Sequence, residues 1–335
     1  NGFVSTSVNS PIQRINDLTP TERGLECVMQ LVNDLEGAGV AGDTKLEGNE
    51  EAMVNDAQII KIDQLRNGVR SKGAMAEQAT VLRFRDQAKD KLGFWLPDKI
   101  DEMMFLAASG RSFTLRTDGS LRASGSQLPN LTFAADVTPA SANRIRYAGT
   151  ATSESTLTAS DKFSWDTVVR ANSAAARQGI RPIRQGGRDY YAIVMSTEQR
   201  RDLVLDPTYQ RIVANAQERG SSNPLFKNAT AVVDGAILYD HRKVFNTTGR
   251  ASGQKWGSAG TVEGAQAILL GAQALGFATI GEGKWAESDN TDYGNRPGVA
   301  YGQIFGILKP QFKPTASAAA REDYGCMSVK TAAAL

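Results

Sequence analysis

The longest regular pattern of apolar and polar positions lies between Met75 and Ser109. Its apolar residues are spaced mostly three or four apart: Val81, Phe84, Ala88, Leu92, Trp95, Leu96, Ile100 and Met103. This spacing predicts a long helix over residues 75–109 with one buried stripe, which indicates core packing and no cofactor role. The opposite face carries basic residues: Arg83, Arg85, Lys89 and Lys91. We expect Pro97 to kink or divide the helix, because proline removes an amide donor and clashes with the preceding turn.

Two extended segments precede this helix. Residues 1–20 are polar and aperiodic and include Pro11, which is typical of an extended arm. Between residues 23 and 70, one candidate strand runs through LECVMQLVNDL and a returning strand through AQIIKIDQL. Ile60, Ile62 and Leu65 keep a partial alternation in the second strand, so the pair predicts a long hairpin-like excursion.

The stretch that connects these strands is acidic. Residues 36–56 contain six carboxylates against Lys45 alone: Glu36, Asp43, Glu47, Glu50, Glu51 and Asp56. Four glycines in the same stretch favour turns: Gly37, Gly39, Gly42 and Gly48. Two interpretations stay open, a solvated loop or a specific electrostatic contact.

Downstream of the long helix, helices and strands mix. Residues 111–146 look irregular, and a helix is predicted over 160–178 with Gly179 at its end. DYYAIVMS is typical of a buried strand, and Ser196 or Thr197 is a credible cap for a helix that stops by Pro207, with a further helix after it. After Gly220 we expect strands in AVVDGAILYDHRKVF, AQAILLGAQALGFATI and PGVAYGQIFGILKP, whereas the tail from Thr315 has too weak a pattern to assign. The predicted fold class is α+β.

Composition narrows the function classes only slightly. The 335 residues suffice for one large domain or two to three lobes, and a net charge of +2 gives no sign of a dedicated nucleic-acid reader. Two cysteines, Cys27 and Cys326, cannot build a disulfide framework and are expected to be small buried hydrophobes. No apolar run approaches the roughly 18 residues of a membrane span. We therefore expect a protein of a reducing cytoplasm without a membrane partner.

Candidate catalytic and ligand motifs are weak. The single histidine, His241, excludes most histidine relays and multi-histidine metal sites, and its charged neighbours indicate a solvated turn. GEGKWAES lacks the glycine spacing and hydroxyl residue of a phosphate loop, and EGNEE and DNTDYGN do not fit a calcium loop. We predict no catalytic, metal or cofactor site and expect no enzyme.

Four segments resemble the major capsid proteins of N-four-like tailed bacteriophages. They are LTPTERGLECVMQLVNDLEGAGVAGDTKLEGNEEA, IIKIDQLRNGVRSKGAMAEQ, FRDQAKDKLGFWLPDKIDEMMFLAASG and YYAIVMSTEQRRDL. The resemblance implies an HK-ninety-seven-type capsid fold. On that fold, residues 1–20 become an N-terminal arm, 21–73 an extended loop and 74–190 a peripheral domain with a spine helix over 75–109. Residues 191–300 become mainly an axial domain, and 301–335 a strand that returns to the peripheral domain and a tail.

The resemblance also implies a function in assembly. Copies would form hexamers and pentamers of an icosahedral head in the virion, assembled in the host bacterial cytoplasm. The head would enclose double-stranded DNA through non-specific contacts, with decoration, scaffolding and portal proteins as further partners. A nanocompartment shell protein that encloses enzyme cargo and a cytoplasmic α/β enzyme remain as alternatives.

Charge suggests where neighbouring copies meet. We expect the acidic loop (Glu47, Glu50, Glu51) to lie over the basic face of a neighbour's long helix (Arg83, Arg85, Lys89) or over its entry (Arg70, Lys72). Each exposed ion pair contributes only about 0.2–1 kcal/mol, but a symmetric shell repeats it many times.

Overall fold

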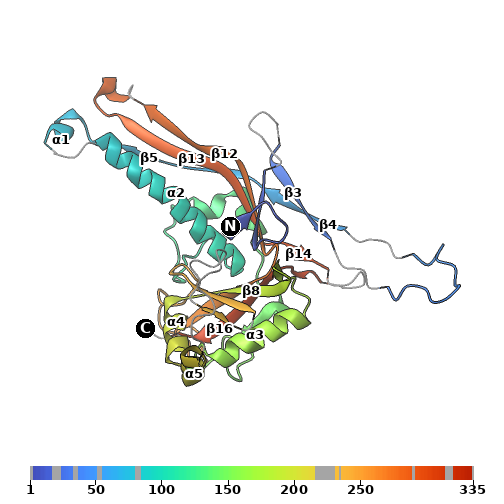
Figure 1. Cartoon of the computed structure of the whole chain (residues 1–335). Helices are drawn as coiled ribbons and strands as arrows, with labels where there is room; N and C mark the ends of the chain where they lie inside the picture. The colour runs from blue at the N-terminus through green and yellow to red at the C-terminus, as the bar shows by residue number, and fades with distance from the viewer. Residues whose placement is uncertain are drawn as a thin grey trace.

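The computed structural model describes residues 3–16, 24–32, 37–50, 55–79, 84–215, 231–233, 235–288, 291–313 and 320–333. These residues form an elongated molecule with two lobes, each built on its own mixed sheet (Figure 1). A two-stranded hairpin projects from the region between the lobes. The combination of helices and sheets agrees with the predicted α+β class.

The seven-stranded lobe has the strand order β6-β16-β11-β8-β10-β9, with β7 paired to β8. Its strands are β6 (Ile145–Tyr147), β7 (Ile183–Gln185), β8 (Arg188–Met195), β9 (Ala231–Val233), β10 (Ala236–Asp240), β11 (Gly264–Leu270) and β16 (Cys326–Ala332). Three helices lie on one face: α3 (Trp165–Arg177), α4 (Thr197–Leu205) and α5 (Pro207–Asn215). They share one core with the sheet, in which Val168, Leu203 and Tyr209 join Ile193 and Leu269.

Local sequence signals explain where these helices begin and end. The Ser196 side chain accepts a hydrogen bond from the Gln199 backbone amide, and the Gln199 Oε1 accepts one from the Ser196 backbone amide, a complete capping box for α4. The chain leaves α4 before Pro207 and begins α5 at that proline, a favoured first helical position. Gly179 has a φ of 69° just beyond α3, a left-handed conformation that glycine adopts easily. These sequence predictions are confirmed.

The five-stranded lobe has the order β1-β2-β12-β13-β5. Its strands are β1 (Val4–Ser5), β2 (Ile12–Ile15), β5 (Asp63–Arg70), β12 (Leu275–Ser288) and β13 (Gly298–Leu308). The helix α2 (Phe84–Ala108) packs along β13 and β5 and, at 25 residues, is about 37 Å long. Leu96, Met103 and Leu106 of α2 share a core with Phe305 and Ile307 of β13.

The long helix differs from its prediction in two respects. Residues 75–109 do not form one helix, because α1 (Ala74–Gln78) ends before α2 begins at Phe84. Pro97 does not divide α2, which is continuous through it. Pro97 lies on the exposed side of the helix, where water can reach the carbonyl that loses its amide donor. Buried leucines on both sides of Pro97 hold the two halves of α2 against the same sheet.

The extended hairpin consists of β3 (Glu26–Val32) and β4 (Asn55–Lys61), paired antiparallel as the sequence predicts. The predicted returning strand is divided, because β4 ends at Lys61 and Leu65 belongs to β5 of the five-stranded sheet. Cys27, Met29, Leu31 and Ile60 face inward and are at most 4% exposed, in one cluster with Ile15. Both cysteines are buried, as expected, and burial raises the pKa of Cys326 to about 12.

Short elements complete the chain. They are α1, the 3₁₀ turns η1 (Leu128–Asn130), η2 (Thr132–Asp136), η3 (Ala142–Arg144) and η5 (Thr291–Gly294), and the paired strands β14 (Gln311–Phe312) and β15 (Glu322–Asp323). The turns η1 to η3 lie in the segment that the sequence predicts to be irregular. The described part of the N-terminal arm pairs with its own chain, because β2 runs parallel to the start of β12.

The two sheets divide the chain differently from the predicted ranges. The helix α3 lies inside the predicted range 74–190, yet it packs on the seven-stranded sheet together with α4 and α5. The strand β12 lies inside the range 191–300 but belongs to the five-stranded sheet beside α2. The unassigned tail supplies β16, which lies between β6 and β11 and is buried along its whole length.

A buried ion pair fixes the end of β13. The side chains of Lys309 and Asp323 are 0% and 1% exposed, with 3.0 Å between the Lys309 Nζ and an oxygen of the Asp323 carboxylate. The Lys309 ammonium also donates to the Pro139 carbonyl, and the Asp323 carboxylate accepts from the Ser141 backbone and the Gln311 side chain. The pair therefore joins β13, β15 and the loop before η3.

We expect Lys309→Met to lower the free energy of unfolding by about 3–5 kcal/mol, because it leaves a buried carboxylate without its cation. The double variant Lys309→Met/Asp323→Asn should recover a large part of that loss, since the amide keeps acceptor capacity without a charge. Urea unfolding followed by circular dichroism measures both. Lys45→Met is the control and should change stability by less than about 1 kcal/mol, because the Lys45–Glu47 pair is 75% and 78% exposed. Equal losses in the single and double variants would contradict this account.

Candidate functional site

The acidic loop lies at the far end of the extended hairpin (Figure 1). Residues 37–50 are exposed almost throughout, and they contain no helix or strand. Glu47 pairs with Lys45 at 2.5 Å, and the Glu50 carboxylate accepts from the Gly48 backbone at 2.7 Å. Glu51 lies outside the described residues. Two of the predicted contact residues, Glu47 and Glu50, are therefore exposed in a loop that lies away from both lobes.

The predicted basic face of the long helix has an acidic partner within its own chain. Lys89 of α2 lies 2.6 Å and Arg85 3.5 Å from the carboxylate of Glu287 on β12. The hydrogen bond and the charge of Lys89 lower the pKa of Glu287. Arg83 lies outside the described residues. The structure thus brings Arg85 and Lys89 together, and Glu287 is a functional neighbour that the sequence analysis missed.

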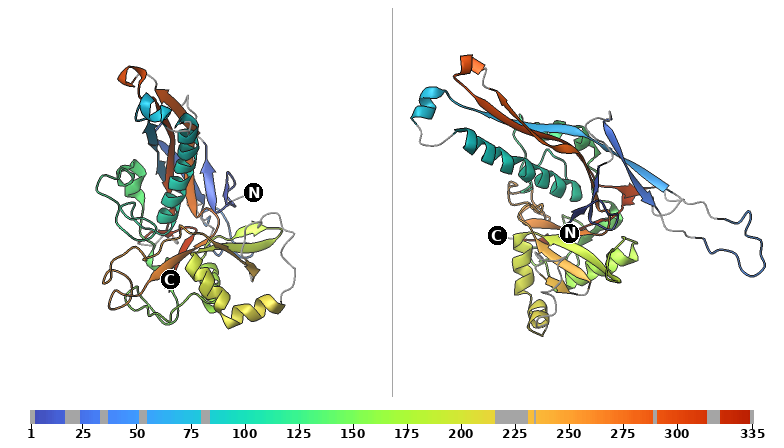
Figure 2. Two further views of the ribbon diagram at one scale, coloured as in Figure 1. Left: turned by 90° about the vertical axis from the view of Figure 1, so that its left-hand side faces the viewer. Right: turned by 45° about the horizontal axis from the view of Figure 1, so that its top comes forward.

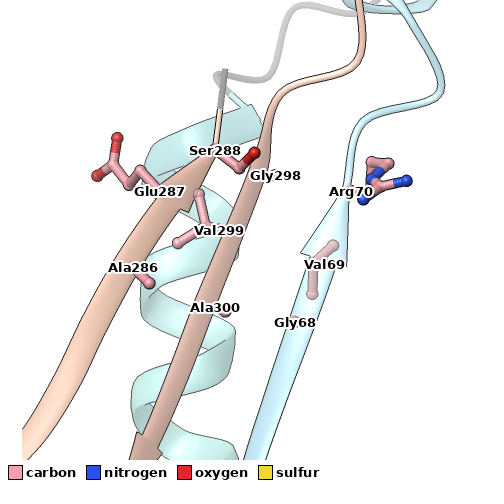
Figure 3. A pocket seen from close by; sticks show the side chains of 9 residues that line it. All are labelled: Gly68, Val69, Arg70, Ala286, Glu287, Ser288, Gly298, Val299 and Ala300. Carbon is pink, nitrogen blue, oxygen red and sulfur yellow. The ribbon is translucent and has the colours of Figure 1, made fainter. Parts of the chain in front are cut away.

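Arg70 and Lys72, the other predicted basic residues, are exposed at the end of β5 and just after it. Arg70 borders a shallow groove of about 440 Å³ across the outer ends of β5, β13 and β12 (Figure 3). Strand pairing places Gly68, Ala300 and Ala286 side by side in one cross-strand row. The next row consists of Arg70, Gly298 and Ser288.

The groove and α2 lie on opposite faces of this sheet. Val299 is 2% exposed and packs against Ala88 and Leu92 of α2. Because side chains alternate along a strand, the rows on either side of Val299 point away from α2. One row further, Arg66 and Lys284 flank Gly302 on the groove face, and both are exposed. The groove thus has a floor of small residues with Arg70 at one end. Glu287, Val69 and Val299 also belong to its lining, and Arg66 and Lys284 lie beyond it.

The lobes meet around a second cavity of about 410 Å³, lined by the end of α2, the N-terminal segment and β11. His241 lies at its border, and its ring is stacked on Phe105 of α2 with 4.6 Å between the ring centres. The His241 Nδ1 accepts a hydrogen bond from the Lys243 backbone at 3.2 Å. Burial lowers the pKa of His241 below its ordinary value of 6.5, although the nearby Asp101 acts in the opposite direction. The predicted turn beside a strand is present, with Arg242 exposed just after β10, whereas the ring of His241 is half-buried against Phe105.

The described residues offer little for catalysis or metal binding. Within these ranges, no three His, Cys, Asp or Glu side chains come together as metal ligands. No helix in the described part of the chain has both the length and the apolar character to cross a membrane.

Sequence reasoning missed the groove because it depends on strand register. Gly68, Ala286 and Ala300 are far apart in the chain, and small residues in a strand carry no functional signal alone. The alternation in LRNGVR and KWAES shows which residues of each strand share a face. Only the strand pairing shows that Arg66, Arg70 and Lys284 lie on the same face of the sheet.

Comparisons with known proteins all point to phage capsid proteins. Residues 2–335 match the family described as phage capsid protein. The chain is 42% identical over 343 residues to the major capsid protein of Pseudomonas phage KPP25, which covers 99% of this chain and 90% of that protein.

Solved structures are similar as well. The capsid of Ralstonia phage GP4 has a TM-score of 0.82 at 29% identity and covers 99% of this chain and 90% of that chain. The Cyanophage Pam1 capsid asymmetric unit has a TM-score of 0.73 at 20% identity over 99% of this chain and 91% of that chain, a likeness of fold alone.

His241 yields a prediction about pH. A lowered pKa means that the unfolded chain takes up the proton first as the pH falls, so stability is full above pH 6.5 and decreases as the pH falls below it. We expect the wild-type chain to lose stability between about pH 7 and pH 5, and His241→Gln to lose much less over that interval. Urea unfolding at both values measures this. Identical pH dependence of the two proteins would contradict it, since the chain has no other histidine.

Proposed function

Because the chain belongs to the phage capsid protein family, we propose that it is the major capsid protein of a tailed bacteriophage, and that its copies form the pentamers and hexamers of an icosahedral head around double-stranded DNA. The observation that carries this proposal is the 42% identity with a phage major capsid protein along 99% of the chain. Family membership confirms the expectation of a structural protein and not an enzyme. Nothing in the comparisons favours a nanocompartment shell protein or a cytoplasmic enzyme.

The shape of the subunit supports assembly from many copies. The acidic loop and the outer half of β12 are exposed, and they extend well beyond the two cores (Figure 1). Elements of this kind gain buried surface only from a neighbouring molecule. Rings in which each copy contacts the next through different patches are the common way to bury such elements with one kind of chain.

We assign the lobes by their architecture. The five-stranded lobe with α2 serves as the peripheral domain, α2 as the spine helix and the seven-stranded lobe as the axial domain. The hairpin of β3 and β4 with residues 37–50 serves as the extended loop. This assignment replaces the predicted ranges because it follows the sheets.

The charge hypothesis also becomes more specific. Arg85 and Lys89 already share Glu287 within the chain, so a neighbour's carboxylates would compete with an existing partner there. The groove offers exposed Arg70 beside small residues that an extended chain can approach closely. Exposed Arg66 and Lys284 lie one row further along the same strands. We therefore propose that Glu47 and Glu50 of one copy lie at this groove of the next, with Glu51 and Lys72 beside the same contact.

The first experiment reverses the charge of the loop. Glu47→Lys/Glu50→Lys should reduce the yield of closed shells strongly while the thermal midpoint of the subunit stays unchanged, because both residues are exposed. Light scattering and negative-stain microscopy measure the yield. Asp166→Lys, which removes a similarly exposed carboxylate on α3, is the matched control and should assemble normally.

The second experiment exchanges the charges. Arg66→Glu/Arg70→Glu should also impair assembly, and its combination with the loop variant should restore shells, since opposite charges face each other again. The wild-type yield should fall with added salt, because salt screens exposed charge pairs. Normal shells from the loop variant, or no rescue by the exchange, would contradict the proposed contact.

A further inference from the structure

The cavity where the lobes meet, here called the inter-lobe cavity, is lined by parts of the chain that lie far apart in the sequence. Its walls come from the end of α2, from β8, β10 and β11, from the start of β12 and from the N-terminal segment. Figure 2 shows this blue N-terminal segment where the two lobes meet. At about 410 Å³, the cavity falls within the range of small-molecule sites, roughly 300–1,000 Å³. A single copy of the chain forms all of these walls.

The N-terminal segment is tied to both lobes, so its wall of the cavity has a defined position. On one side, β2 pairs with the start of β12 in the five-stranded sheet. On the other side, the Asn9 side chain donates to the Arg184 carbonyl of β7 at 2.5 Å and accepts from the Arg184 amide at 2.8 Å. The Phe3 ring meets the Tyr239 ring of β10 edge-on, with 4.6 Å between the ring centres. A molecule in the cavity would therefore contact both lobes and the segment that joins them.

The interior of the cavity is apolar, and its aromatic rings are incompletely covered. Ile268 and Leu275 in its wall are 1% and 3% exposed. Phe3, Phe105 and Tyr239 belong to the same hydrophobic cluster and line the cavity, yet they are only half-buried. Partly covered aromatic rings around an apolar space favour a flat aromatic body, which can pack against them and displace water.

The border of the cavity carries an acid without a matching base. Asp101 of α2 lines the cavity and is exposed, and no Lys or Arg within the described ranges forms an ion pair with it. The two cations that follow His241 in the chain, Arg242 and Lys243, pair with Asp98 instead, at 3.3 and 2.6 Å. The Asp101 carboxylate can therefore attract a cation from solution.

Two further polar residues line the same border. Asp240 has Arg200 at 3.6 Å, so it adds less negative charge than Asp101 does. Burial lowers the pKa of His241, so its ring is neutral near pH 7 and does not repel a cation. Because the His241 Nδ1 accepts from a backbone amide, the neutral ring carries its proton on Nε2. The border thus favours a ligand whose polar group is positively charged.

We propose that the inter-lobe cavity binds a small aromatic amine, whose rings lie among Phe3, Phe105 and Tyr239 and whose ammonium group lies beside Asp101. Aromatic faces also attract cations, which adds to the attraction of the carboxylate. The bound amine stabilises the docking of the lobes, because it contacts both of them and the N-terminal segment. This inference goes beyond the proposed function and does not rest on it, since the cavity lies within one copy.

Calorimetric titration of the full chain tests the proposal with tryptamine as the probe. Indolepropionate, which has the same ring system and a carboxylate in place of the ammonium, is the control ligand. We expect tryptamine to bind, and indolepropionate to bind roughly tenfold more weakly, because Asp101 attracts the first and repels the second. Equal affinities for the two ligands, or no binding of tryptamine, would overturn the proposal.

Two variants locate the binding site. Asp101→Lys should reverse the preference, so that indolepropionate binds better than tryptamine, and its thermal midpoint should stay close to that of the wild type because Asp101 is exposed. Met104→Trp places a larger side chain in the cavity wall and should weaken the binding of both ligands roughly tenfold. Asp90→Lys, which changes an exposed carboxylate of α2 away from the cavity, is the matched control and should keep the wild-type preference. An unchanged preference in a folded Asp101→Lys variant contradicts the proposed position of the ammonium.

Hydrogen exchange provides a readout that does not depend on any variant. Saturating tryptamine should slow the exchange of amides in residues 3–15 several-fold, because the N-terminal segment forms a wall of the cavity. Amides in residues 37–50, far from the cavity, should not change. Binding of tryptamine without protection of residues 3–15 would place the ligand elsewhere and refute the inference. Failure of the chain to form shells would refute the proposed function alone.

Discussion

A buried polar network at the end of α2 holds the two lobes in one orientation. Arg111, just beyond α2, donates to Gln266 of β11 at 3.2 Å and to Glu154 at 2.6 Å. Lys330 of β16 lies 2.7 Å from the same Glu154 carboxylate, and Gln266 also donates to the Ser109 carbonyl at 2.8 Å. Burial alone would raise the pKa of Glu154, but Arg111 and Lys330 overcome it and hold that pKa below its ordinary value. The direction in which α2 leaves the seven-stranded lobe is fixed by these bonds.

The fixed direction of α2 determines where the exposed surfaces for neighbouring copies lie. A helix about 37 Å long carries a small angular error at its base to a displacement of several ångströms at its end. The groove lies on the sheet that packs along α2, so its position depends on the network at the base of that helix. Weak contacts between copies add up across a shell only when every copy presents them at the same place. The buried network thus stabilises the geometry on which assembly depends.

Sequence reasoning predicted the elements that follow local rules. The apolar stripe in α2, the pairing of the extended hairpin, the helix cap at Ser196 or Thr197 and the stop before Pro207 depend on nearby residues only. It failed on β16, because Ser328, Lys330 and Thr331 make that strand look polar, although each side chain has a buried partner elsewhere in the chain. It also failed to pair Arg85 and Lys89 with Glu287, a contact between residues almost two hundred positions apart. The sequence shows which residues are acidic and which are basic. Only the pairing register of the strands shows which of these residues lie on the same face of the sheet.

The central claim is that the projecting elements are ordered surfaces for neighbouring copies. Hydrogen exchange measured on the free subunit and on assembled particles tests it most directly. Amides in residues 37–50 should exchange rapidly in the free subunit and become protected in the particle. Amides of β16, already buried within the subunit, should change little. Equal exchange of the acidic loop in both states would contradict the account.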